Sequence, residues 1–114
     1  MCPLANADAA NYLDSIDDPA ISIVTTHELI VGARDKRDLI AIDSLISTYA
    51  VVHIDTAIGH FAYELLKRYA KSDGLRTFDS LIAATAIVEN CTLVSRNRKH
   101  FAMIEGLRLE APQY

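Results

Sequence analysis

Short apolar segments alternate with longer helical patterns along this chain, and this alternation limits its fold more than any other feature. The strand-like segments are brief, whereas the helical segments repeat apolar residues every three or four positions. Short strands separated by helices predict a parallel sheet sandwiched between helices, a three-layer α/β/α arrangement. The length of 114 residues favours a single domain spanning 1–114.

The expected elements are set by the positions of these segments. Strands are expected at 20–25, 50–54, 91–95 and 107–111. Helices are expected at 7–16, 26–34, 37–48, 56–71 and 78–89. The last of these helices is apolar nearly all round, so it should be buried in the core.

Composition excludes several classes of protein. A net charge of −4 argues against a general nucleic-acid coat protein, although it allows a local basic groove. The longest uncharged apolar run, 80–88, is too short to span a bilayer, so no membrane partner is expected. The two cysteines, Cys2 and Cys91, form no metal or redox motif, and we expect free thiols in a reducing cytoplasm.

Polar residues come directly after the expected strands. Glu28 follows the first strand, Asp55 the second and Asn97 the third, while Asp79 opens the buried helix. In parallel sheets, ligand sites lie beyond the carboxyl ends of the strands. These four residues are therefore expected near one rim of the sheet.

Each of these residues also has a purely structural explanation. Thr25 and Glu28 in "TTHE" fit a capping box, in which the glutamate bonds back to the cap amide. Asp79 at a helix start is stabilised by the helix dipole. Asn97 is an ordinary turn residue.

Taken together, two carboxylates and an amide at one rim could bind a hard cation. Mg²⁺ takes oxygen ligands and keeps several waters, so one or two carboxylates plus a substrate phosphate can suffice. The turn "RNRKH" places Arg96, Arg98, Lys99 and His100 nearby, where they could contact a phosphate backbone. A solvated turn with outward-pointing charges explains the same run equally simply.

Three blocks of the sequence carry a resemblance to a known family: "ISIVTTHELIVGAR", "GLRTFDSLIAATAIVENCTLVSRNRKHF" and "IEGLRLEAP". Their order and spacing resemble PIN-domain proteins, and most of all the VapC-type toxins of toxin–antitoxin pairs. The resemblance covers nearly the whole chain. It implies an endoribonuclease dependent on Mg²⁺ or Mn²⁺, homodimeric, cytoplasmic and held inactive by a cognate antitoxin.

The resemblance also implies roles for individual residues. The second and third acidic residues of the family fall on Glu28 and Asp79, which would be the metal ligands. Asn97 falls where some members carry a fourth acid, and Ser95 falls where the family often has threonine. These four residues would form the catalytic site, and RNA would contact three neighbouring cations: Arg96, Arg98 and Lys99.

One part of the family pattern is missing from this sequence. The family begins with an apolar strand in the middle of the sheet that ends in the first metal-binding aspartate. This chain starts at "MCPLANADAANYL", which resembles the family segment located after that strand. We therefore expect the first strand to be absent, either by truncation or because the true start lies upstream.

This gap leaves two alternatives to the nuclease open. A catalytically inactive PIN-like module could still dimerise or bind an antitoxin. A receiver-type phosphoacceptor domain also clusters acids at a strand rim, and Asp55 could serve there, but no later strand ends in the lysine it requires.

Overall fold

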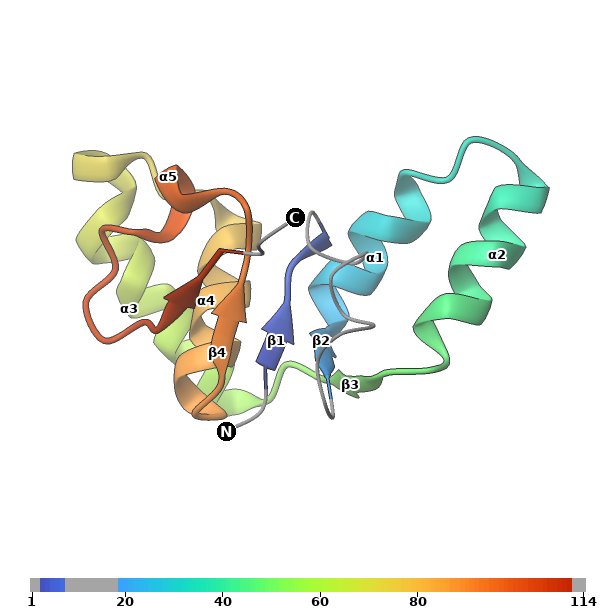
Figure 1. The fold of residues 1–114 in the computed structure, drawn as a ribbon. Coiled ribbons are helices and arrows are strands. Elements are labelled where there is room, and N and C mark those ends of the chain that lie inside the picture. Colours follow the sequence, from blue (N-terminus) through green and yellow to red (C-terminus); the bar gives the residue numbers. More distant parts are fainter. Residues whose placement is uncertain (1–2, 8–18, 112–114) are drawn as a thin grey trace.

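The computed structural model describes residues 3–7 and 19–111. Five parallel strands form one sheet in the order β3-β2-β1-β4-β5 (Figure 1). The strands are β1 (Pro3–Ala5), β2 (Ala20–Ser22), β3 (Ala50–Val52), β4 (Thr92–Val94) and β5 (Leu109–Glu110). The helices are α1 (Ile23–Val31), α2 (Lys36–Ile46), α3 (Thr56–Asp73), α4 (Thr77–Val88) and α5 (Arg98–Phe101). The predicted parallel sheet with flanking helices is confirmed, while the helix expected at 7–16 falls almost entirely outside the described residues.

The expectation of a missing central strand is wrong. Strand β1 occupies the middle of the sheet, where Leu4 pairs with Ala20 on one side and with Leu93 on the other. Leu4 and Ala5 are almost completely buried. Pro3 is tolerated because it stands at the first position of the strand. A strand of three residues opening with proline is too short to show a periodic pattern, which explains why the sequence hides it.

Helix α4 supplies the centre of the hydrophobic core, as its apolar sequence predicts. Ile82, Ala83 and Ala84 are fully buried. The helix packs along α3 and against β4, whose Leu93 is also fully buried. This packing fixes the amino end of α4, and with it Asp79, relative to the ends of the strands.

The junction between β2 and α1 differs from the capping-box interpretation. Helix α1 begins at Ile23, and its cap is Ser22, whose Oγ accepts a hydrogen bond from the Val24 amide at 3.1 Å. Thr25 is therefore inside the helix and cannot be its cap. Glu28 lies in the body of α1 and is exposed, so the capping box does not account for it.

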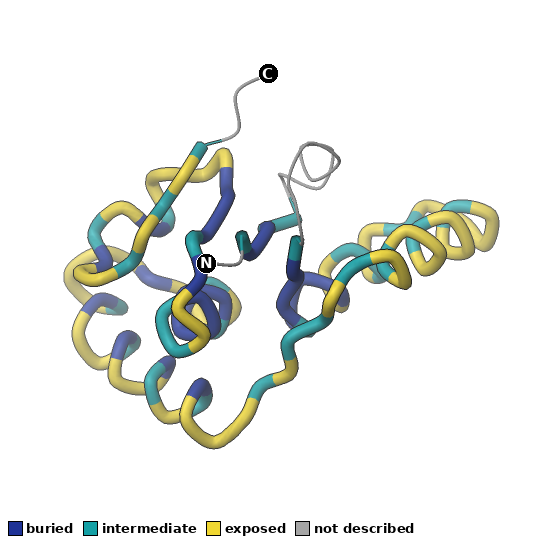
Figure 2. The backbone as a smooth tube through the Cα atoms, turned by 60° about the horizontal axis from the view of Figure 1, so that its bottom comes forward, coloured by how far each residue is buried: buried dark blue, intermediate teal, exposed yellow. Residues whose placement is uncertain are grey.

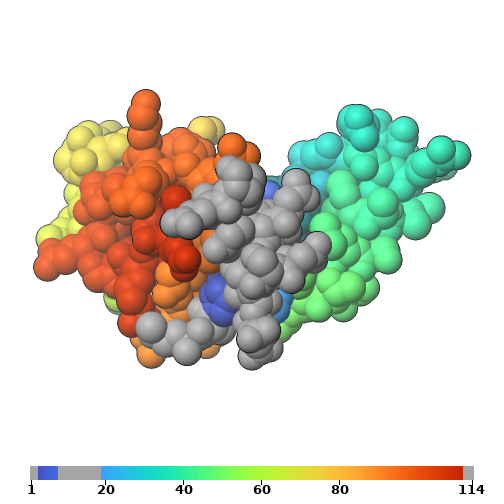
Figure 3. Space-filling view, in the orientation of Figure 1, coloured from blue at the N-terminus to red at the C-terminus, as the bar shows by residue number. Residues whose placement is uncertain are grey.

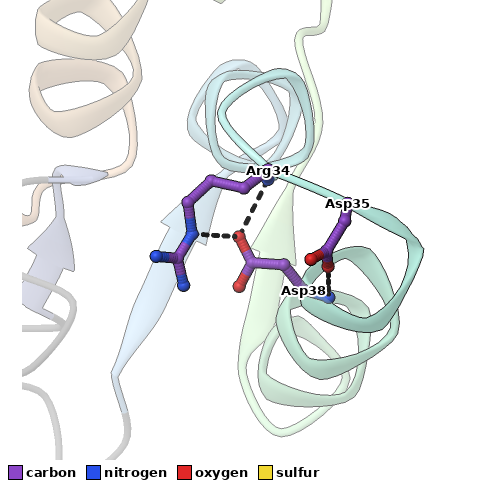
Figure 4. Close-up of polar contacts among 3 residues, drawn as sticks. All are labelled: Arg34, Asp35 and Asp38. Atoms are coloured by element: carbon purple, nitrogen blue, oxygen red, sulfur yellow. Dashed lines mark hydrogen bonds and ion pairs between the residues drawn. The ribbon is translucent and has the colours of Figure 1, made fainter.

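Helices α1 and α2 form an arm that projects from the sheet (Figure 1 and Figure 2). Helix α2 has no buried residue, and the space-filling view shows the arm as one flank of the molecule (Figure 3). The turn between the helices is fixed by Asp38, whose Oδ2 accepts hydrogen bonds from the Arg34 amide at 3.0 Å and from Arg34 Nε at 3.5 Å (Figure 4). The hydrogen bond from the Arg34 amide holds the pKa of Asp38 below its ordinary value. The charge of the Arg34 guanidinium acts in the same direction with a smaller effect.

Two further expectations concern the cysteines and the membrane. Cys91 is disulfide-bonded, so the expectation of a free thiol is wrong for this residue. Because disulfides are rare in a reducing cytoplasm, Cys91 gives no support for that compartment. Within 3–7 and 19–111, none of the helices combines the length and the apolar character that crossing a membrane requires.

Candidate metal and nucleic-acid site

A cavity of about 840 Å³ opens where the carboxyl ends of β1 and β4 meet. We call it the rim cavity. Its charged and amide-bearing lining residues come from separate segments of the chain: Asn6, Glu28, Arg76, Asp79, Asn97 and His100. The sheet thus brings together Glu28, Asp79 and Asn97, as their positions after the strands and at a helix start predict.

The two carboxylates reach the rim cavity from different helices. Glu28 projects from α1 and is exposed, whereas the side chain of Asp79, in the first turn of α4, keeps only 18% of its surface exposed. His100 Nδ1 lies 3.3 Å from Asp79 Oδ2. Because His100 belongs to α5, this contact ties the end of β4 to the start of α4 and helps to orient the Asp79 carboxylate.

Ser95 does not line the rim cavity. It is completely buried immediately after β4, and its Oγ accepts hydrogen bonds from the Asn97 amide at 3.0 Å and from Asn6 Nδ2 at 3.4 Å. The hydroxyl therefore connects the ends of the two central strands. This geometry favours a positioning role for Ser95 over direct contact with a ligand.

The predicted RNA-binding cations occupy a different place. Arg96, Arg98 and Lys99 are exposed, and none of them lines the rim cavity. Arg76, at the cap position of α4, is the arginine that does. Contact of RNA with these three cations stays a prediction.

Sequence reasoning missed Asn6 and misplaced Asp55. Asn6 directly follows the central strand and lines the rim cavity, near the end of the strand where the family resemblance implies an aspartate. Its signal is the short "PLAN" segment, which is apolar up to the amide. Asp55 does not line the cavity. Its Oδ1 instead caps α3 by accepting a hydrogen bond from the Ile58 amide at 2.8 Å.

The donor set of the rim cavity fits a hard cation such as Mg²⁺ or Mn²⁺. Glu28 and Asp79 offer carboxylate oxygens, and Asn6 and Asn97 offer amide oxygens. In 3–7 and 19–111, however, no cluster of three or more acidic, histidine or cysteine side chains is arranged to hold a metal ion. Among the described residues the fit therefore depends on two carboxylates, and neutral oxygens, water or a substrate phosphate could supply further ligands.

Comparison with known proteins agrees with the fold and with the sequence blocks. Residues 5–107 match the PIN domain family, so the chain belongs to this family. Ribonuclease VapC19 of Mycobacterium tuberculosis is 31% identical over 107 residues, which cover 93% of this chain and 85% of that protein.

Solved structures of toxin–antitoxin proteins share the fold. VapBC2 from Rickettsia felis, bound to a DNA fragment from its promoter, superposes with a TM-score of 0.82 at 24% identity, covering 97% of this chain and 98% of that one. A toxin–antitoxin complex from Klebsiella pneumoniae gives a TM-score of 0.80 at 26% identity, with the same coverage.

Proposed function

We propose that this chain is a divalent-metal-dependent endoribonuclease of the VapC toxin type, held inactive by a protein antitoxin. The observation that carries the proposal is the convergence of Glu28, Asp79 and Asn97 on one cavity at the carboxyl ends of the strands. The relative named Ribonuclease VapC19 supports the activity, and the toxin–antitoxin complex from Klebsiella pneumoniae supports the antitoxin.

The residues of the rim cavity suit hydrolysis of an RNA phosphodiester. Glu28 and Asp79 would hold Mg²⁺ or Mn²⁺, which when bound lowers the energy of the negative charge that develops on the phosphate. Arg76 provides a positive group that can contact the phosphate, and the His100 ring lines the same cavity. The backbone amide of Asn97 donates a hydrogen bond to Ser95 Oγ, which fixes the residue. Its side-chain oxygen can then orient the cation or a water molecule.

The arm formed by α1 and α2 is the part of the molecule that supports the proposed protein partners. Helix α2 exposes the large apolar side chains of Leu39, Ile40 and Leu45, and Ile40 has 70% of its surface accessible. Large apolar side chains exposed on a helix that buries no residue are available for contact with a protein partner. We propose that the antitoxin and a second copy of this chain cover this surface. Cytoplasmic localisation then follows from the RNA substrate.

A catalytically inactive binding module is the second candidate, because one observation favours it. Asn6 provides a neutral amide directly after the central strand, near where the family resemblance implies an aspartate, and the described lining residues include two carboxylates. Such a module would retain the arm and the rim cavity, and it would bind partners without cleaving RNA.

Metal-dependent cleavage separates the two candidates. We expect the purified chain to cut total cellular RNA in Mn²⁺ or Mg²⁺ and to stop when excess chelator is added, as measured by gel electrophoresis. Re-addition of Mn²⁺ should restore cleavage. An inactive chain that still binds Mn²⁺ or an antitoxin would favour the binding module, and cleavage that continues in excess chelator would contradict the proposed chemistry.

A further inference from the structure

A second, smaller hollow lies beside the rim cavity, and the proposed function leaves it unused. It measures about 190 Å³ and is lined by Val24, His27, Glu28, Val31 and Phe78. We call it the Phe78 pocket. Phe78 has 62% of its surface exposed, although it lies in the first turn of α4, whose middle is buried. An aromatic ring in this position offers an open face to whatever enters.

The two hollows share two lining residues. Glu28 and Phe78 line both the rim cavity and the Phe78 pocket. A group seated in the Phe78 pocket therefore lies beside whatever occupies the rim cavity. If the rim cavity holds a phosphodiester, its immediate neighbour along the strand is a nucleoside.

We infer that the Phe78 pocket binds a nucleobase of single-stranded RNA, stacked on the ring of Phe78 and adjacent to the phosphodiester in the rim cavity. This inference rests on the proposed ribonuclease function and adds a substrate-positioning residue to it. The proposed RNA is single-stranded, because taking a base out of a duplex to reach the ring would add the cost of unpairing and unstacking it.

The shape and chemistry of the pocket suit a base. An apolar cavity of about 150 Å³ is enough for a benzene ring, so the Phe78 pocket can take one planar ring system. Val24 and Val31 provide aliphatic walls, and the exposed His27 places a polar ring beside them. A base combines flat apolar faces with polar edges, which matches this lining.

Equilibrium binding without divalent cations tests the inference, because it separates base contact from cleavage. The probes are a short fluorescein-labelled RNA of mixed sequence and a base-free ribose-phosphate strand of the same length, measured by fluorescence anisotropy in chelator. Phe78→Ala should weaken binding of the RNA by roughly 5- to 150-fold and leave binding of the base-free strand unchanged. Phe78→Leu should behave like Phe78→Ala, and Phe78→Trp should retain wild-type affinity.

Tyr63→Ala is the matched control, because Tyr63 is an aromatic residue with 59% exposure on α3 and lines neither hollow. Its RNA affinity should equal that of the wild type. The inference is overturned if Phe78→Ala binds RNA as tightly as this control, the outcome expected when Phe78 instead receives a side chain from a protein partner. An equal loss on the base-free strand also overturns it.

Cleavage of RNA by the wild type in Mn²⁺, measured on the same preparation, keeps the two proposals distinguishable. Cleavage with no effect of Phe78→Ala on affinity rejects the base pocket and retains the nuclease. Base-dependent binding without cleavage rejects the nuclease and retains the base pocket.

Discussion

Replacing Asp79 by asparagine should reduce RNA cleavage by roughly 100-fold or more while the protein stays folded. The substitution keeps the size of the side chain and removes the charge of one carboxylate that lines the rim cavity. Loss of a single electrostatic contact to the transition state costs about 3 kcal/mol in well-studied enzymes, which corresponds to roughly 100-fold in rate. Initial rates of RNA cleavage in Mn²⁺ measure the effect.

Glu89→Gln is the appropriate control for this experiment. Glu89 is exposed at the opposite end of α4 from Asp79 and does not line the rim cavity, so its loss of charge should leave the rate unchanged. Thermal melting of both variants checks the fold. A fully active Asp79→Asn variant would remove Asp79 from the proposed site.

Replacing Asn6 by aspartate should strengthen Mn²⁺ binding by about tenfold or more, because the affinity of a site for a hard cation rises with its number of charged ligands. The local structure can accept the change. Asn6 Oδ1 already accepts a hydrogen bond from the Ala7 amide at 2.9 Å, and an aspartate oxygen would do the same. The Ser95 hydroxyl, which now accepts a bond from Asn6 Nδ2, can rotate to donate instead.

The same substitution should have opposite effects on stability with and without the ion. Without metal, the added carboxylate beside Glu28 and Asp79 introduces repulsion and should lower the Tm. With saturating Mn²⁺, tighter binding should raise it above the wild-type value.

Calorimetric titration of Mn²⁺ gives the affinity directly, with Asn90→Asp as the control. Asn90 is exposed, and its Oδ1 accepts a bond from Arg108 Nη2 at 2.6 Å, an interaction that an aspartate would keep. This control adds the same charge outside the rim cavity and should leave Mn²⁺ affinity unchanged. Equal Mn²⁺ affinities for Asn6→Asp and the wild type would show that Asn6 lies outside the metal-binding site.

The part of the site that could be predicted from the sequence consists of residues whose positions depend on local rules. Asp79 opens a strongly apolar helix, and Asn97 follows a recognisable strand, so the topology of a parallel sheet is enough to bring them to one rim. The same rule places Glu28 at the rim, even though its helix begins at Ile23 and not at 26. Ser22 takes the capping role expected of Thr25 because the strand ends earlier than its β-branched run suggests.

The part that could not be predicted depends on contacts between distant segments. Strand β1 is recognisable only from its partners, since Leu4 pairs with Leu93, far along the chain. Without that strand, no local pattern places Asn6 at the rim. The positions of Arg76 and Phe78 depend on how α4 packs along α3 and against the arm, which no local pattern records.

The location of a bound Mn²⁺ ion tests the central claim most directly. Crystals of the wild-type chain grown with Mn²⁺ can be examined by anomalous diffraction at the manganese edge. We expect a peak in the rim cavity within coordination distance of the carboxylates of Glu28 and Asp79. The absence of a peak there from a chain that cleaves RNA in Mn²⁺, or a peak elsewhere on the protein, would contradict the proposed metal site.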